Sequence, residues 1–260
     1  MHHRLQAFIR YRDIVWYRTL AGLKSEARQQ FLGYIWLLLE PCITTAIVYV
    51  VYVFIFQTRG ADQVVMLLVG TIVWQWFESS VMQGMGGIKA KLHIMIHFKL
   101  PKYIFPLVGI LTNTWKFLCV FLVLLTFCAA CGFPPNWHFL WLPLVLAAQL
   151  VLIIGLALPL AIAVTYFSDL TTVVSSIFRL LMFISGVFFT VTTVPPAARR
   201  YFYLNPMAGL IESYRYVIMW HQGPNLAALA YALCWGLSFG TLGLVWCSYI
   251  DGKILKRVNG

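Results

Sequence analysis

Six stretches of the chain are long and apolar enough to cross a lipid bilayer as helices. A helix needs about 20 predominantly apolar residues to span the ~30 Å hydrocarbon core, and each stretch reaches that length. The predicted spans are residues 34–56, 64–83, 104–131, 139–167, 170–194 and 226–250, all approximate. Six crossings put both termini on one side of the membrane. The pattern therefore predicts an all-α polytopic membrane protein with six transmembrane helices per subunit.

Residues 1–29 follow a different pattern, in which apolar and basic positions occupy separate faces of a helix. The apolar face carries Leu5, Ile9, Trp16, Leu20 and Leu23. A helix of this kind lies in the membrane interface and does not cross it. We expect an amphipathic interface helix that either rests on anionic lipid or also contacts a partner. The six-span domain then covers residues 30–260.

The segment between the fifth and sixth spans, residues 195–223, is too polar to cross a bilayer and too apolar for a solvated loop. Asn205-Pro206 divides it, because proline cannot continue a helix and disfavours helical geometry in the residue before it. Irregular backbone facing lipid would leave peptide groups unpaired, so the segment must lie at the surface or line a protein cavity. We expect an external hairpin of two short re-entrant helices. Its candidate residues are Arg199, Arg200, Asn205, Pro206, Glu212 and Arg215.

Composition supports lipid as the solvent. The 260 residues are 61% hydrophobic and 10% charged, with a mean hydropathy of +0.82, whereas globular proteins carry roughly 25% charged residues. About 30 mixed residues precede the first apolar run, a start unlike that of a cleavable signal peptide. The six cysteines lie in or beside apolar runs, so we interpret them as small buried hydrophobic residues and not as a disulfide framework.

The distribution of positive charge predicts the orientation. Most of the 19 Lys and Arg residues lie on the side of the termini: Arg4, Arg10, Arg12, Arg18, Lys24, Arg28, Lys89, Lys91, Lys99, Lys102, Lys253, Lys256 and Arg257. The opposite side has Arg59, Arg199, Arg200 and Arg215. Because cytoplasmic loops carry the excess of Lys and Arg, we expect both termini in the cytoplasm and the hairpin outside.

Two basic residues, Lys116 and Arg179, fall inside predicted spans. Each costs about 2.5–3.5 kcal/mol on insertion scales unless it finds a partner or water. Helical rise places Glu78 at a depth comparable to both. We expect Glu78 to form an intramembrane ion pair with one of them. Such a pair either only fixes helix register or takes part in a transport path.

The cytoplasmic loop 84–103 is basic and apolar, and Gly86-Gly87 allows the chain to turn at its start. It could rest on lipid headgroups or fit a socket on a soluble subunit. Its candidate contact residues are Lys89, Lys91, His93, His97 and Lys99. His93 and His97 have zinc-protease spacing, but Ile94 stands where such a site needs glutamate, which disfavours a metal site. Asp169 is in position to cap the fifth span.

Enzymatic signatures are missing from the sequence. It has no G-x-x-x-x-G-K-[ST] phosphate loop, and its acids are scattered without paired carboxylates or a metal cluster. Ion-driven carriers usually show several intramembrane ionisable groups or matching interrupted helices, and the two halves of this chain do not match. We therefore expect no cofactor on this chain. If a solute moves, the energy comes from another subunit.

Several runs together resemble a known family. They are Gln30 to Pro41 after the basic helix, Leu100-Pro101-Lys102, Ser185-Gly186, Val194-Pro195, Leu204-Asn205-Pro206-Met207, Glu212 and Arg215. In order and spacing, over nearly the whole chain, they resemble the ABC-2 type permeases that export bacterial surface polysaccharides, namely the O-antigen, capsule and teichoic acid exporters. Where many members have Arg-Asp after the fourth span, this chain has Ser168-Asp169, which puts a partner salt bridge at that position in doubt.

The resemblance implies a homodimer in the bacterial inner membrane, docked to two copies of a nucleotide-binding ATPase subunit that holds the ATP and Mg²⁺. The N-terminal helix, the loop around Lys89 to Lys99, and Asp169 would provide the cytoplasmic contacts. The glycan would pass between the two copies, past the first and fifth spans. We expect protein, lipid and glycan partners and no nucleic acid.

Aromatic side chains give this path a physical basis, because sugar rings present apolar faces that can slide over aromatic rings. The candidates are Tyr49, Tyr52 and Phe56 in the first span and Phe178, Phe183, Phe188 and Phe189 in the fifth. Each could instead face lipid or pack in the core.

The predicted function is the membrane subunit of an ATP-driven exporter that moves a lipid-linked polysaccharide from cytoplasm to periplasm. One alternative is an ABC-2 permease for a drug or small lipid. Another is a membrane-embedded transferase acting on lipid-linked sugars, which would need external acid or histidine residues. The sequence offers His138, Glu212 and His221 for that role.

Overall fold

The regular structure is helical throughout the part of the chain that the computed structural model describes: residues 13, 15–22, 35–55, 60–90 and 102–250. The elements are α2 (Ile35–Ile55), α3 (Ala61–Ala90), α5 (Ile104–Ala130), η1 (Trp137–Trp141), α6 (Leu142–Tyr166), α7 (Leu170–Ile184), η2 (Val191–Thr193), α8 (Arg199–Phe202), α9 (Pro206–Ile218) and α10 (Leu226–Ile250). The prediction of an all-α chain is confirmed for these residues.

Four helices in the described ranges are long and apolar enough to cross a membrane: Asp62–Ala90, Ile104–Ala130, Trp137–Tyr166 and Leu226–Cys247. They coincide with the second, third, fourth and sixth predicted spans. Two shorter apolar helical stretches, Cys42–Val51 and Leu170–Ile184, lie in the first and fifth. The chain is therefore a multi-helix membrane protein, while the count of six crossings stays a prediction.

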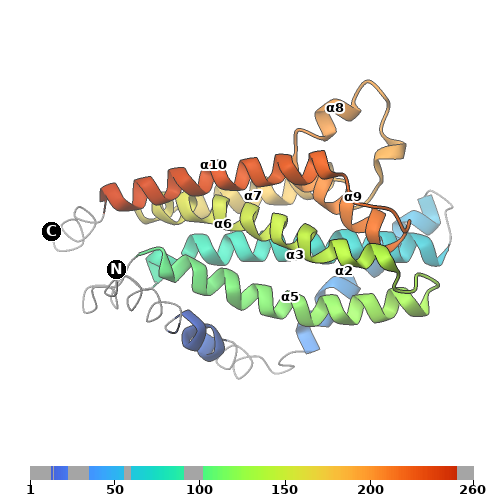
Figure 1. The fold of residues 1–260 in the computed structure, drawn as a ribbon, viewed down its shortest axis with the longest axis horizontal. Coiled ribbons are helices and arrows are strands. Elements are labelled where there is room, and N and C mark those ends of the chain that lie inside the picture. Colours follow the sequence, from blue (N-terminus) through green and yellow to red (C-terminus); the bar gives the residue numbers. More distant parts are fainter. Residues whose placement is uncertain (1–12, 14, 23–34, 56–59, 91–101, 251–260) are drawn as a thin grey trace.

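Helix α3 forms the centre of the bundle, packed against α5, α6, α2, α9 and α7. Its membrane-length window is 72% buried, which explains why it is apolar all round and not on one face. The long helices run side by side, and α8 and α9 lie at the end opposite the start of α5 (Figure 1). This end of the bundle holds the densest set of polar contacts.

Helices α6 and α10 approach each other closely at glycines. A Cβ on Gly155 would lie 2.1 Å from the Gly236 carbonyl oxygen, and a Cβ on Gly236 would lie 2.6 Å from the Val151 carbonyl oxygen. Small residues permit this backbone approach between membrane helices. The glycine face of α10 is therefore used within the chain.

The prediction that the chain turns at Gly86-Gly87 is wrong, while the end of the second crossing near residue 83 stays a prediction. Helix α3 continues through both glycines to Ala90. A Cβ on Gly87 would meet the Phe105 carbonyl oxygen at 2.9 Å, so this glycine provides close helix packing and not a turn. Lys89 lies exposed on the last turn of α3. Lys91, His93, His97 and Lys99 lie outside the described residues.

The predicted fifth span, 170–194, is not one continuous helix. Helix α7 has 15 residues and ends at Ile184, a length of about 22 Å at 1.5 Å per residue. Gly186 follows with a φ of +74°, a left-handed conformation that glycine adopts without steric cost. From Ser185 to Val194 the chain is irregular apart from η2.

The part of the N-terminal helix that is described, residues 15–22, packs against α5. The rings of Trp16 and Trp115 meet edge to face at 5.7 Å, and the Arg18 guanidinium lies 5.9 Å from the centre of the Phe105 ring. The contact buries Thr19, which is 1% exposed. The rest of the predicted interface helix lies outside the described residues.

Candidate functional site

Arg215 on α9 is completely buried and donates hydrogen bonds to four backbone carbonyls. Its Nη1 donates to Gly186 at 2.7 Å and Phe189 at 2.9 Å. Its Nη2 donates to Val187 at 2.7 Å and to Met66 of α3 at 3.2 Å. One guanidinium thus ties the irregular segment after α7 to both α3 and α9.

This arrangement satisfies two groups that are expensive to bury alone. A buried charge costs free energy unless it is paired and hydrogen-bonded. Irregular backbone at membrane depth is tolerated only where protein or water satisfies its peptide groups. Three carbonyls of the 185–194 segment, those of Gly186, Val187 and Phe189, accept hydrogen bonds from Arg215, which satisfies both the guanidinium and these three peptide groups. The polar side chain therefore makes the early end of α7 possible.

Glu212, one turn before Arg215, is 1% exposed and holds two further segments. Its Oε1 accepts a hydrogen bond from the backbone N–H of Val191 at 2.9 Å. Its Oε2 accepts one from the Tyr203 hydroxyl at 2.6 Å. Burial and the neighbouring Glu212 carboxylate raise the pKa of Tyr203 above its ordinary value, so the hydroxyl keeps the proton that it donates.

Asn205 begins α9, and Pro206 is its first residue, as the Asn-Pro break predicts. The Asn205 side-chain oxygen accepts a hydrogen bond from the backbone N–H of Met207 at 3.0 Å, which caps the helix. Its amide also donates to the Ser185 hydroxyl at 2.6 Å, at the end of α7.

The two helices predicted around that break are present but differ from expectation in character. Helix α8 has only four residues. Helix α9 is buried along nearly its whole length, so it is a core helix. The external, re-entrant placement of the pair stays a prediction. A Cβ on Gly209 would lie 2.6 Å from the Ala228 Cβ, which shows how tightly α9 packs on α10.

Gly70 of α3 completes this region and was missed from the sequence. A Cβ there would lie 2.6 Å from the Val187 carbonyl oxygen and 2.8 Å from the Arg215 Nη2. A glycine within an apolar span was the available signal, since such glycines often mark close backbone approach. We call the set the Arg215 network: Gly70, Ser185, Gly186, Asn205, Glu212 and Arg215.

Arg199 and Arg200, also predicted for the hairpin, are exposed at α8. The Arg199 Nε donates to the Val194 carbonyl at 3.1 Å. Arg200 stacks over the ring of Tyr201 at 4.8 Å and donates to its hydroxyl at 2.8 Å. The two arginines therefore lie on the surface, in contrast to Arg215.

The predicted aromatic residues of the fifth span separate into two groups. Phe178 is buried, with its ring centre 5.2 Å from that of Phe77 and 6.4 Å from that of Trp74. Phe183 is 61% exposed, and its ring lies 5.4 Å from Phe188. Phe178 is thus placed in the core of the chain, while Phe183 is on its surface.

The remaining aromatic candidates have varied surroundings. Phe189 packs beside Phe202, with ring centres 5.8 Å apart. Tyr49 on α2 is half-buried against the core. The side chain of Tyr52 and the whole of Phe56 lie outside what is described. Asp169 is exposed at the N-cap position of α7 and makes no side-chain capping hydrogen bond to a described residue.

The surface of α7 carries a polar stripe. Thr172, Ser176 and Arg179 are exposed, with Phe183 one turn further along the same line. Val174 and Phe178 occupy the buried side. The helix is therefore sharply two-sided, and its outward side includes a charge.

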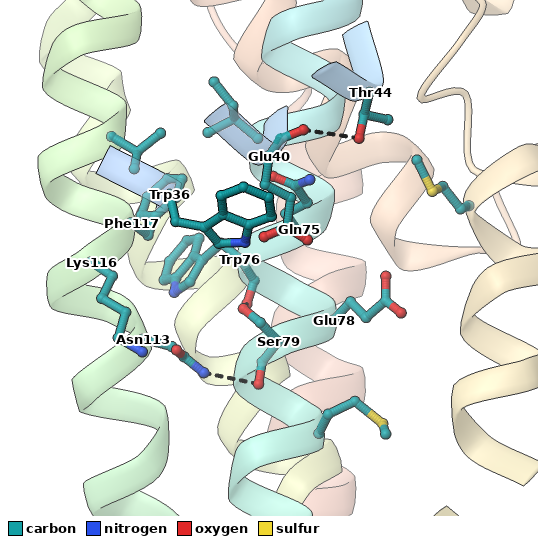
Figure 2. Close-up of a pocket in the computed structure, with 14 residues that line it drawn as sticks. Trp36, Glu40, Thr44, Gln75, Trp76, Glu78, Ser79, Asn113, Lys116 and Phe117 are labelled. Carbon is teal, nitrogen blue, oxygen red and sulfur yellow. Dashed lines mark hydrogen bonds between the residues drawn. The ribbon is translucent and has the colours of Figure 1, made fainter. Parts of the chain in front are cut away.

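A cavity of about 640 Å³ lies between α2, α3 and α5. Its lining includes Glu78, which extends from α3, and Lys116, which extends from α5; the two lie on opposite sides of α3 in Figure 2. The Glu78 carboxylate accepts a hydrogen bond from the Trp74 Nε1 at 3.1 Å. The proposed ion pair of Glu78 with Lys116 or Arg179 stays a prediction.

Comparisons with known proteins agree over most of the chain. A 236-residue alignment, covering 88% of this chain and 91% of the relative, is 27% identical to the "O-antigen export system permease protein RfbA" of Myxococcus xanthus. A protein of the same name from Klebsiella pneumoniae is 24% identical over 208 residues, 80% of each chain. The model of the ABC-2 type transporter family matches residues 15–219. This match covers most of the chain, which therefore belongs to the ABC-2 type transporter family.

Proposed function

We propose that this chain is the permease subunit of an ATP-driven exporter that moves a lipid-linked surface polysaccharide, of O-antigen or capsule type, from cytoplasm to periplasm. The observation that carries the proposal is the length of the similarity to O-antigen export permeases, which covers 91% of the Myxococcus xanthus relative. A similarity of this extent includes the transmembrane region and the α8–α9 segment together.

The proposed subunit has six crossings, with both termini in the cytoplasm of a bacterial inner membrane. Helix α2 has 21 residues, about 32 Å of helix, which is enough to cross the hydrocarbon core. Helix α7 is too short to do so alone. In this proposal the irregular segment 185–194 completes the fifth crossing. The Arg215 network provides hydrogen bonds for backbone groups of this segment at membrane depth.

The polar stripe of α7 supports a second copy of the chain. Arg179 is exposed on this helix, and a charged residue facing lipid costs about 2.5–3.5 kcal/mol on insertion scales. A water-filled path between two copies removes that cost. We propose that the stripe, with Phe183, Phe188 and Phe189 beyond it, lines the path for the glycan. Tyr49, Tyr52 and Phe56 of the first span stay candidates for the same path. Phe178 is omitted because it is buried.

ATP and Mg²⁺ belong to a separate nucleotide-binding subunit in this proposal, present in two copies. Its contacts would be the N-terminal helix and the cytoplasmic residues Lys89, Lys91, His93, His97, Lys99 and Asp169. Lys89 at the end of α3 and Asp169 at the start of α7 are both exposed, as a docking role requires.

The two alternatives have less support. A transferase would need available external acids or histidines, but both oxygens of Glu212 already accept hydrogen bonds within the fold. His221 contacts Asn136. A permease for a drug or small lipid fits the family equally well, but the named relatives favour polysaccharide.

The test is removal of the chain from its native cell. We expect surface polysaccharide to disappear and lipid-linked glycan to accumulate on the cytoplasmic side, with both restored by re-expression. Normal surface polysaccharide without the chain would contradict the proposal. Failure to make the lipid-linked glycan at all would point to the transferase instead.

A further inference from the structure

The cavity between α2, α3 and α5 lies halfway across the bundle. Its walls use Ile72 to Met82 of α3 and Asn113 to Val120 of α5, the middle parts of both helices. Its volume of about 640 Å³ is within the roughly 300–1,000 Å³ range of small-molecule sites. Polar groups at this depth are expensive, and a cavity that retains them is a candidate binding site.

The lining combines aromatic rings with planar polar side chains. Trp36 of α2 is 44% exposed at the cavity. Trp76 of α3 is held in place, since it stacks on Phe117 with ring centres 4.1 Å apart and its Nε1 donates to Thr114 at 3.3 Å. These residues offer a fixed aromatic wall.

The polar side chains come from the same helices and gather around the aromatic wall (Figure 2). They are Glu40 of α2, Gln75 and Glu78 of α3, and Asn113 and Lys116 of α5. Asn113 is oriented by the hydrogen bond that its Nδ2 donates to the Ser79 carbonyl at 2.9 Å. Met82 and Met182 add flexible apolar contacts, which can adapt to more than one ligand shape.

This combination matches the chemistry of a sugar ring. One face of the ring carries C–H groups that pack on an indole, and the hydroxyls around its rim can donate to carboxylates and amide oxygens. Hydrogen bonds to an ionised carboxylate are roughly twice as strong as neutral ones. Lys116 is the one basic side chain among the lining residues and stands beside two acidic ones, so the lining does not gather the positive charge that favours a phosphate or pyrophosphate.

We propose that this cavity, which is lined by α2, α3, α5 and Met182 of α7, binds one or two neutral sugar residues of a glycan. The inference rests on the proposed function, because it gives the exporter a holding site for its substrate at mid-depth. The cavity would hold one part of the glycan while the rest of the glycan moves through the transporter.

A plug at Ser79 tests the proposal. Ser79 is exposed at the cavity wall, and Ser79→Phe would fill the space while leaving the carbonyl that Asn113 uses. Ser79→Ala removes the hydroxyl without filling the cavity. Ser238→Phe is the matched control, since Ser238 is an exposed helical serine on α10. Thermal unfolding of each variant checks that it is folded.

The first readout is binding of neutral disaccharides, mannobiose and N,N′-diacetylchitobiose, to the full chain in lipid nanodiscs by saturation-transfer NMR. We expect wild type, Ser79→Ala and Ser238→Phe to bind at least one of them with a Kd of about 1–10 mM. Ser79→Phe should weaken binding at least about tenfold. Equal binding by folded Ser79→Phe, or no binding of either sugar to wild type, would overturn the inference. So would preferential binding of inorganic pyrophosphate.

The second readout, polysaccharide export in the native cell, separates this inference from the proposed function. We expect Ser79→Phe to lower export per transporter while Ser238→Phe does not. Wild-type export by folded Ser79→Phe would contradict the proposed sugar site in the cavity without contradicting the exporter function. If cells without the chain have normal surface polysaccharide but the wild-type chain binds sugar, the exporter function is contradicted and the sugar site is kept.

Discussion

The Arg215 network and the mid-bundle cavity both contain acidic and basic side chains, but these are buried and hydrogen-bonded in the network and border open space in the cavity. In the network, Glu212 and Arg215 are at most 1% exposed, and their hydrogen bonds go to fixed groups of the protein. In the cavity, Glu78 and Lys116 border about 640 Å³ of open space. Burial with hydrogen bonds to fixed groups of the protein indicates a structural role, whereas polar groups around an opening at membrane depth indicate a ligand. Residue type alone does not distinguish the two.

Removing the guanidinium should have the largest effect. Arg215→Met removes the donor for the carbonyls of Gly186, Val187 and Phe189. Each unsatisfied buried group costs about 1–3 kcal/mol, so we expect a loss of about 3 kcal/mol or more. The variant should fail to accumulate in the membrane, as measured by immunoblot of membrane fractions. Arg200→Met, a change at an exposed arginine, is the control and should accumulate normally. Stable, folded Arg215→Met would show that the network does not hold the segment after α7.

Gly70→Ala, which adds one methyl group, should have an intermediate effect on stability. Its Cβ would lie 2.6 Å from the Val187 carbonyl oxygen and 2.8 Å from Arg215 Nη2. Relieving this overlap should cost about 1–3 kcal/mol, seen as a lower unfolding temperature in detergent. Gly86→Ala in the same helix, where an added Cβ meets nothing within 4 Å, is the matched control. Equal unfolding temperatures for the two variants would refute the close approach at Gly70.

Removing the N-terminal cap of α9 should have a smaller effect on stability. Asn205→Ala removes the bond to the Met207 N–H and should cost about 1 kcal/mol. Asn205→Asp keeps that acceptor but loses the amide that donates to Ser185, so it should recover part of the loss in unfolding temperature. If Asp restored nothing, the bridge to Ser185 and not the cap would be the main contribution of Asn205.

Much of the helical layout could be predicted because hydropathy and length report it directly. The second, third, fourth and sixth predicted spans coincide with apolar helices of membrane length. The break at Asn205-Pro206 was predictable because proline acts locally. The end of α7 was not, since Val187, Phe188 and Phe189 continue the apolar run past Gly186, and hydropathy does not register a left-handed glycine.

The Arg215 network was only partly accessible from the sequence. Asn205, Glu212 and Arg215 were candidates, but as members of an external hairpin in which arginine counts as a surface charge. Its burial depends on carbonyls from residues 66 and 186–189, which are distant in sequence. The cavity was hidden for the same reason, because Glu40, Glu78 and Lys116 come to line one space only when three helices assemble.

The most direct test compares a glutamate of the Arg215 network with a glutamate of the cavity. The same isosteric change is made at each, Glu212→Gln and Glu78→Gln, and the unfolding temperature and the export per folded transporter are measured for both variants. Glu212→Gln should lower the unfolding temperature, because the amide nitrogen cannot accept one of the two hydrogen bonds. Glu78→Gln should leave stability within about 0.5 kcal/mol of wild type and lower export. A destabilised Glu78→Gln with normal export per molecule, beside an unaffected Glu212→Gln, would contradict the account.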